Sequence, residues 1–136
     1  MLSIPEYGWV DVSIGNWIDR ASYLTDPHLD LMDAFINLLN NKKVSAVNFD
    51  AEGWEYIIVL DLYSSYVIDS KEERPQLYNF DISANILAEE LYKDISNNLY
   101  KWSVWDCIVE DEKTRLEKEI EIKNKLQELR KAIDSF

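Results

Sequence analysis

The sequence has one cysteine, one histidine and only three glycines among its 136 residues. With Cys107 as the single cysteine, the chain cannot form an intrachain disulfide, which favours a reducing compartment. One histidine and one cysteine cannot make a zinc site unaided. The isolated glycines Gly8, Gly15 and Gly53 do not form a phosphate-binding loop, and no serine lies in a Gly-x-Ser-x-Gly turn. We therefore expect no cofactor and no metal.

Long hydrophobic runs are also missing. The longest apolar stretch, residues 56–60, is far shorter than the about 20 residues that a membrane helix needs. Residues 1–6 lack the basic start and the apolar centre of a secretory signal. The sequence therefore predicts a cytoplasmic protein with no membrane contact.

Basic residues are scarce, and the acids are unevenly distributed. The chain has 14 Lys and Arg against 26 Asp and Glu, a net charge of -12 at pH 7. Residues 110–136 hold eight acids and seven bases, so residues 1–109 keep 18 acids against 7 bases. This charge repels nucleic acid and anionic lipid and favours a basic partner. Because 12% of the residues are aromatic, the acidity belongs to a folded domain rather than to a disordered tail.

The length fits a single domain over residues 1–136, with an acidic body (1–109) and a charge-balanced C-terminal helix (110–136). Apolar residues at spacings of three and four predict helices over residues 27–40 and 82–99. Pro27 suits the first turn of the former helix, and Asp81 is the expected N-cap of the latter.

Alternating apolar residues predict an antiparallel meander of about four strands, so the fold class is α+β. The expected strands cover residues 44–50, 54–62, 66–69 and 76–80. Gly53 would supply the left-handed position of the first hairpin loop. In the second strand, Glu55, Ile57, Val59 and Asp61 share one face, which is apolar in the middle and acidic at the ends.

The remaining segments give weaker patterns. Residues 7–14 suggest a short strand, residues 17–24 a short helix, and residues 100–109 a short strand or a packed connector. A final helix is expected over residues 111–133, with a narrow apolar seam. The seam consists of Ile122, Leu126, Leu129, Ile133 and Phe136. This helix either docks along the body or pairs with a second chain, giving a homodimer through Ile122, Leu126, Leu129 and Ile133.

Catalytic chemistry is not expected from these residues. His28, in the first turn of a helix, has no neighbour at metal-ligand spacing, so a structural role is favoured. Cys107 lies beside Asp106 and close to Glu110 and Asp111, whose charges disfavour the reactive thiolate. We therefore interpret Cys107 as a buried structural thiol and the protein as a non-enzyme.

The positive signal is a cluster of acids in the predicted hairpin and after the third strand. Between residues 50 and 73 there are seven acids and one base, Lys71. We predict that this cluster, with Trp54 as a partly exposed anchor, binds a partner. The predicted contacts are Asp50, Glu52, Trp54, Glu55, Asp61, Asp69, Glu72 and Glu73. Pairs such as Glu52 with Glu55, or Asp61 with Asp69, could in principle support acid–base or metal chemistry, but a solvated face is the simpler interpretation.

A small, acidic α+β domain rich in Trp and Tyr resembles the immunity proteins of bacterial contact-dependent inhibition and polymorphic toxin systems. The resemblance covers the whole chain in size, charge and composition, and it rests on no diagnostic motif. It implies a protein that binds and neutralises a basic protein toxin, often a nuclease domain, without cofactors. The acidic face would then mimic phosphate and steer a fast encounter.

Two alternatives remain open. An acidic nucleic-acid mimic that inhibits a host enzyme would use the same electrostatics. An oligomeric adaptor would instead assemble through the C-terminal helix, and its acids would serve solubility.

Overall fold

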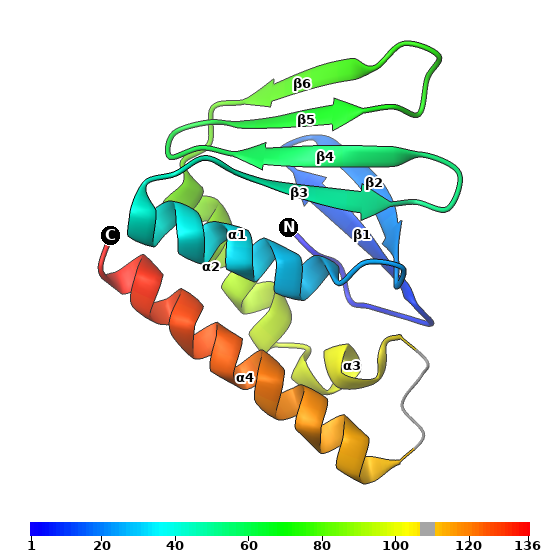
Figure 1. The fold of residues 1–136 in the computed structure, drawn as a ribbon, viewed down its shortest axis with the longest axis vertical. Helices are drawn as coiled ribbons and strands as arrows, with labels where there is room; N and C mark the ends of the chain where they lie inside the picture. The colour runs from blue at the N-terminus through cyan, green and yellow to red at the C-terminus, as the bar shows by residue number, and fades with distance from the viewer. Residues whose placement is uncertain (107–110) are drawn as a thin grey trace.

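The computed structural model describes residues 1–106 and 111–136 as an α+β fold (Figure 1). A four-stranded antiparallel sheet is combined with helices, as the sequence predicts, and a second, two-stranded antiparallel sheet is added to them. The strands are β1 (Trp9–Ile14), β2 (Trp17–Ser22), β3 (Ser45–Asp50), β4 (Glu55–Leu60), β5 (Ser65–Asp69) and β6 (Gln76–Phe80). The helices are α1 (Pro27–Asn41), α2 (Ala84–Ser96), α3 (Leu99–Val104) and α4 (Glu112–Asp134).

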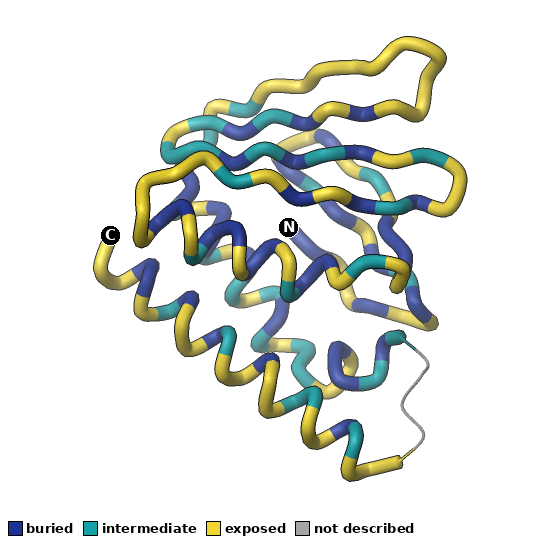
Figure 2. Tube along the Cα trace, viewed as in Figure 1, coloured by how far each residue is buried: buried dark blue, intermediate teal, exposed yellow. Residues whose placement is uncertain are grey.

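Strands β3 to β6 form the predicted meander, in the order β3-β4-β5-β6. All four helices lie on the β3 side of this sheet, and β6 forms its outer edge (Figure 1). Helix α1 packs against β3 and β4, and α4 packs on α1, α2 and α3. The core therefore lies between the inner face of the sheet and the helices, as the dark segments of Figure 2 show.

The hairpin β1–β2 corrects one prediction. Residues 7–14 contain the expected strand, but the short helix predicted over residues 17–24 is wrong because this segment is β2. Gly15 and Asn16 form a two-residue connection between Ile14 and Trp17, which pair directly. Gly15 has φ +57°, a conformation that costs glycine little. A Cβ there would lie 3.1 Å from Cδ1 of Phe80, so the turn packs closely on β6.

Helix α1 confirms the predicted helix, with Pro27 in its first turn. Asp26 is the N-cap residue, although its side chain makes no capping hydrogen bond. At the other end Lys42 adopts the left-handed conformation and donates its backbone N–H to Leu38 O. The loop between β3 and β4 contains two residues of positive φ, Glu52 (+54°) and Gly53 (+149°), so glycine is one of two residues that turn the chain.

Helices α2 and α3 occupy a segment for which the sequence predicts one longer helix followed by a strand or a connector. The predicted helix 82–99 begins later, with Ser83 rather than Asp81 as N-cap, and it ends at Ser96. Asn98 then donates its side-chain amide to the Asp94 carbonyl, and α3 follows. The segment 100–109, expected as a strand or connector, is helical to Val104, and Cys107 lies outside the described residues.

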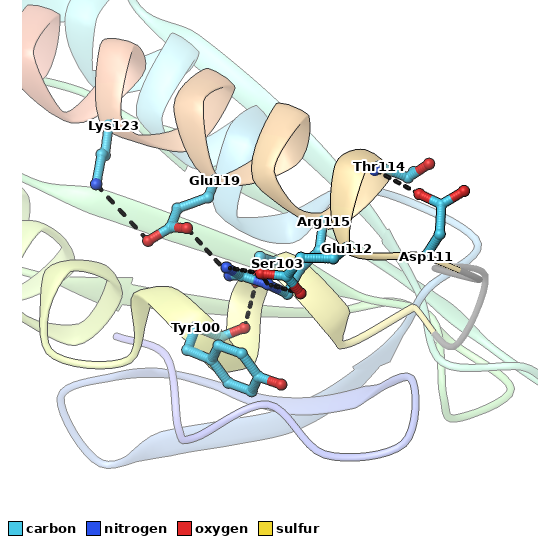
Figure 3. Close-up of polar contacts among 8 residues, drawn as sticks. All are labelled: Tyr100, Ser103, Asp111, Glu112, Thr114, Arg115, Glu119 and Lys123. Carbon is cyan, nitrogen blue, oxygen red and sulfur yellow. Dashed lines mark hydrogen bonds and ion pairs between the residues drawn. The ribbon is translucent and has the colours of Figure 1, made fainter.

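Helix α4 confirms the predicted C-terminal helix. Asp111 is its N-cap and accepts a hydrogen bond from Thr114 N at 2.7 Å (Figure 3). The four seam residues Ile122, Leu126, Leu129 and Ile133 are buried in the core of the same chain. Phe136 is 44% exposed. Of the two arrangements that the seam allowed, the structure has the docked helix, so a homodimer through these four residues would require α4 to leave the body.

Charged contacts hold α4 in place at several points. Arg115 reaches from its first turn to α3, where Nη1 donates to Ser103 Oγ at 3.2 Å and the guanidinium lies over the Tyr100 ring (Figure 3). The same guanidinium binds the carboxylates of Glu112 and Glu119. Farther along, Lys125 pairs with Asp33 at 2.7 Å and Arg130 with Glu89 at 2.6 Å. Arg115, Lys125 and Arg130 thus fasten α4 to α3, α1 and α2.

Candidate protein-interaction face

The two faces of the four-stranded sheet differ in burial. One face, called here the inner face, points into the core. Its buried hydrophobic side chains are those of Val47, Phe49, Tyr56, Ile58, Leu60 and Val67. The opposite, outer face consists of the alternating residues between them, and their side chains are partly or largely exposed. The outer face is therefore the surface on which the sheet meets solvent.

The middle of the outer face is apolar. The strand register places Ile57 beside Ile68, and Ile68 beside Leu77, in one row across β4, β5 and β6. A second row places Val59 beside Tyr66. Ile68 is 38% exposed and Leu77 is 68% exposed. A contiguous exposed apolar area on a folded protein is typical of an interaction site.

Acids close both ends of this apolar area. Asp50 and Glu55 are cross-strand partners at one end, and Asp61 follows the outer-face residues of β4 at the other. Like charges directly opposite one another on a sheet are destabilising, so the pair of Asp50 and Glu55 has a cost in the free protein. Strands β3 to β6 contain no Lys or Arg.

Two loops add acids to the first end. The β3–β4 loop and the β5–β6 loop lie together, because Ser70 donates both its backbone N–H and its hydroxyl to the Glu55 carbonyl, at 3.2 and 2.6 Å. The exposed side chains of Glu52, Glu72 and Glu73 extend from these loops. We call this set the acidic end; it consists of Asp50, Glu52, Glu55, Glu72 and Glu73.

The acidic end lacks compensating charge. Among residues 1–106 and 111–136, none of its five carboxylates forms an ion pair with Lys or Arg. The acids Asp33, Glu89 and Glu119 of the helices, by contrast, all hold basic partners. Five acids of the body without a basic partner therefore lie together at one end of the sheet.

Three of the predicted contact residues lie elsewhere. Asp61 directly follows β4, six residues after Glu55, so the two residues are roughly 20 Å apart at opposite ends of the strand. Asp69 is on the inner side, 7% exposed, and accepts a hydrogen bond from Lys71 N at 2.9 Å. Asp61 and Asp69 therefore do not form a carboxylate pair. Five of the eight predicted residues make up the acidic end.

Trp54, the predicted anchor, is half-buried on the inner side. Its indole N–H donates to Asp19 Oδ2 at 2.8 Å. The Arg20 guanidinium and the Lys71 ammonium lie 4.9 and 4.7 Å from its ring centroid. Trp54 thus connects the hairpin β1–β2 to the sheet, and its polar group is already satisfied.

The apolar residues of the outer face were not among the predicted contacts. The alternation of β4 places Ile57 and Val59 on the face of Glu55 and Asp61, as predicted. Ile68 and Leu77 belong to short strands whose pattern does not reveal which side is covered. The exposed face follows only from the packing of α1 and the β1–β2 hairpin on the other side.

His28, the single histidine, lies in the core. His28 is buried and stacks on Trp102, with ring centroids 4.3 Å apart. Burial lowers the pKa of His28 to about 3, so the imidazole is neutral at physiological pH. In the described part of the chain no three His, Cys, Asp or Glu side chains form a metal-binding group. No helix there is long and apolar enough to span a membrane.

Comparisons of the chain with protein-family models, with curated proteins and with solved structures find no match.

Proposed function

We propose that this protein is a stoichiometric inhibitor that binds a basic protein toxin, most simply a nuclease domain, in the manner of an immunity protein. The observation that carries the proposal is the outer face, with its exposed apolar middle and the uncompensated acidic end. A catalytic role has no comparable support among the described residues, because the polar side chains that lie close together there form ion pairs and hydrogen bonds that hold helices and strands to one another.

The two parts of the surface have complementary tasks. Exposed Ile68 and Leu77 offer apolar area that a partner can remove from water, which supplies affinity. The acidic end attracts a basic surface over a distance comparable to the Debye length, which speeds the encounter. A Lys or Arg from the partner placed between Asp50 and Glu55 would relieve their mutual repulsion.

The cytoplasm is the proposed location, since the single cysteine gives the fold no disulfide. A nucleic-acid mimic acting on a host enzyme would use the same face, and the identity of the bound partner separates it from a toxin inhibitor. An adaptor that assembles through α4 is less favoured, because the seam of that helix already packs in the core.

The test uses charge reversal at the acidic end with a matched control. The test variant carries Glu52→Lys, Glu55→Lys, Glu72→Lys and Glu73→Lys. The control carries four reversals at exposed acids without ion pairs elsewhere: Asp11→Lys, Glu117→Lys, Glu121→Lys and Glu128→Lys. Each protein is immobilised, incubated with lysate of the source cells at low salt, and eluted with rising salt.

Wild type and control should retain a basic protein at one-to-one stoichiometry, and the test variant should lose it. The eluted partner is then assayed for nuclease activity with and without added wild-type protein, which should abolish that activity. Equal retention by both variants would place the binding surface elsewhere. A retained partner whose activity is unaffected would contradict inhibition.

A further inference from the structure

Strand β6 is an open edge of the sheet. Among residues 1–106 and 111–136 it pairs only with β5, and its residues Gln76 to Asn79 are exposed on both faces, as the upper yellow segment of Figure 2 shows. Leu77 is 68% and Tyr78 is 41% exposed. An edge of this kind presents unpaired backbone donors and acceptors to any strand that can approach it.

The hydrogen-bond pattern of the sheet identifies which groups face outward. Asp61 N–H donates to Ser64 O at 3.0 Å and Ser70 N–H to Glu55 O at 3.2 Å. Hydrogen-bonded and non-hydrogen-bonded pairs alternate along an antiparallel ladder. Residues 65, 67 and 69 therefore point their backbone groups toward β6. Their register partners on β6 are residues 80, 78 and 76, which leaves the N–H and C=O of Leu77 and Asn79 on the open edge.

The edge lacks the features that normally prevent strand pairing. Natural edge strands are protected by inward lysines, prolines within the strand or β-bulges. Residues Gln76–Phe80 contain no charged residue and no proline. The five consecutive pairs with β5 show no bulge. Pro75 and Arg74 lie just before the strand and not within it. The five residues of the edge strand therefore carry no proline and no charge that would prevent pairing.

We propose that two copies of this chain pair through β6, antiparallel about a two-fold axis at Tyr78, into one continuous sheet. In this register Leu77 of each copy lies opposite Asn79 of the other, and each N–H meets a C=O. A register centred on Leu77 would instead place Pro75, which has no N–H, opposite Asn79. The Leu77 register would therefore leave the Asn79 carbonyl without a donor, whereas the Tyr78 register pairs the N–H and the C=O of both Leu77 and Asn79.

Side chains and flanking charges agree with this arrangement. On the outer face, Leu77 of the two copies would be diagonal neighbours, and each continues the row formed by Ile57 and Ile68. Arg74 precedes the strand and Asp81 follows it. Antiparallel pairing therefore brings Arg74 of one copy close to Asp81 of the other. A parallel partner would set like charges together.

The net charge gives the dimer a distinctive salt dependence. Two copies of net charge -12 repel each other, and salt screens that repulsion. The dimer should therefore strengthen as salt rises, whereas the proposed complex with a basic partner should weaken. The two interactions are thereby distinguishable, and failure of one leaves the other standing.

Sedimentation velocity on the purified protein tests the proposal over a concentration series, at about 0.05 M and about 0.5 M salt. The wild type should move from 16.0 kDa toward twice that mass, at lower concentration in high salt. Leu77→Lys should remove the dimer. Asn79→Pro removes an outward N–H and no hydrogen bond to β5; it should also remove the dimer, and it is the second test if Leu77→Lys misfolds. Ala46→Lys, on the opposite edge strand, is the matched control and should behave as wild type.

A wild-type protein that stays at 16.0 kDa under all these conditions would overturn the proposal. A dimer that persists in both Leu77→Lys and Asn79→Pro would overturn it as well. Circular dichroism of each variant checks that the fold is retained. Because only the purified chain is used, the outcome does not depend on the existence of a basic partner.

Discussion

Replacing Leu129 by alanine tests the docking of α4 on the body. Leu129 is fully buried in the core, and α4 contacts α1, α2 and α3. Truncation of a buried leucine leaves a cavity and costs about 3–5 kcal/mol. That is a large share of the roughly 5–15 kcal/mol that stabilises a typical domain. The melting temperature should fall by roughly 10–20 °C.

Leu116→Ala provides the matched control, because it is the same substitution in the same helix at a side chain that is 44% exposed. Its free energy of unfolding should stay within about 0.5 kcal/mol of wild type. Urea unfolding followed by tryptophan fluorescence measures both variants. If Leu129→Ala were as stable as wild type and lost only self-association, α4 would be an assembly helix and its docked position would be refuted.

Two further predictions concern buried polar groups. Between pH 6.5 and about 3 the unfolded chain binds a proton at His28 that the folded chain, in which the pKa of His28 is about 3, does not bind. The free energy of unfolding should therefore fall as the pH is lowered through this range, by up to about 1.4 kcal/mol per pH unit. His28→Phe should flatten this dependence between pH 6.5 and about 5, and an unchanged slope would show that another group is responsible. Tyr56→Phe removes the hydrogen bond from Tyr56 Oη to Arg20 O, 2.9 Å long, and should lower the free energy of unfolding by about 1 kcal/mol. Tyr63→Phe, at a side chain that is 75% exposed, is its control, and equal losses in urea unfolding would contradict the role of the bond.

The N-terminal hairpin shows why a short segment is hard to assign from sequence. Trp17 and Ala21 are four residues apart and both buried, and residues at this spacing share one face of a helix and also one face of a strand. The local signal for the hairpin was the two-residue connection Gly15-Asn16 between apolar runs. Pairing of Ile14 with Trp17 then follows from the turn.

The candidate interaction face was predictable in part. Alternation along β4 places Glu55 and Asp61 on one face with Ile57 and Val59 between them, as observed. The inward orientation of Asp69 depends on its register with Tyr56, which the length of the preceding turn decides. Which face remains open depends on where the helices and the β1–β2 hairpin pack, and this long-range packing has no local signal.

The most direct test of the proposed function is a titration of the captured partner at several salt concentrations. We expect the wild-type affinity to fall as salt rises, and the variant with Glu52, Glu55, Glu72 and Glu73 reversed to lose at least about tenfold in affinity, or about 1.4 kcal/mol. The control with reversals at Asp11, Glu117, Glu121 and Glu128 should bind nearly as wild type. An affinity that is independent of salt and equal in both variants would contradict recognition through the acidic end.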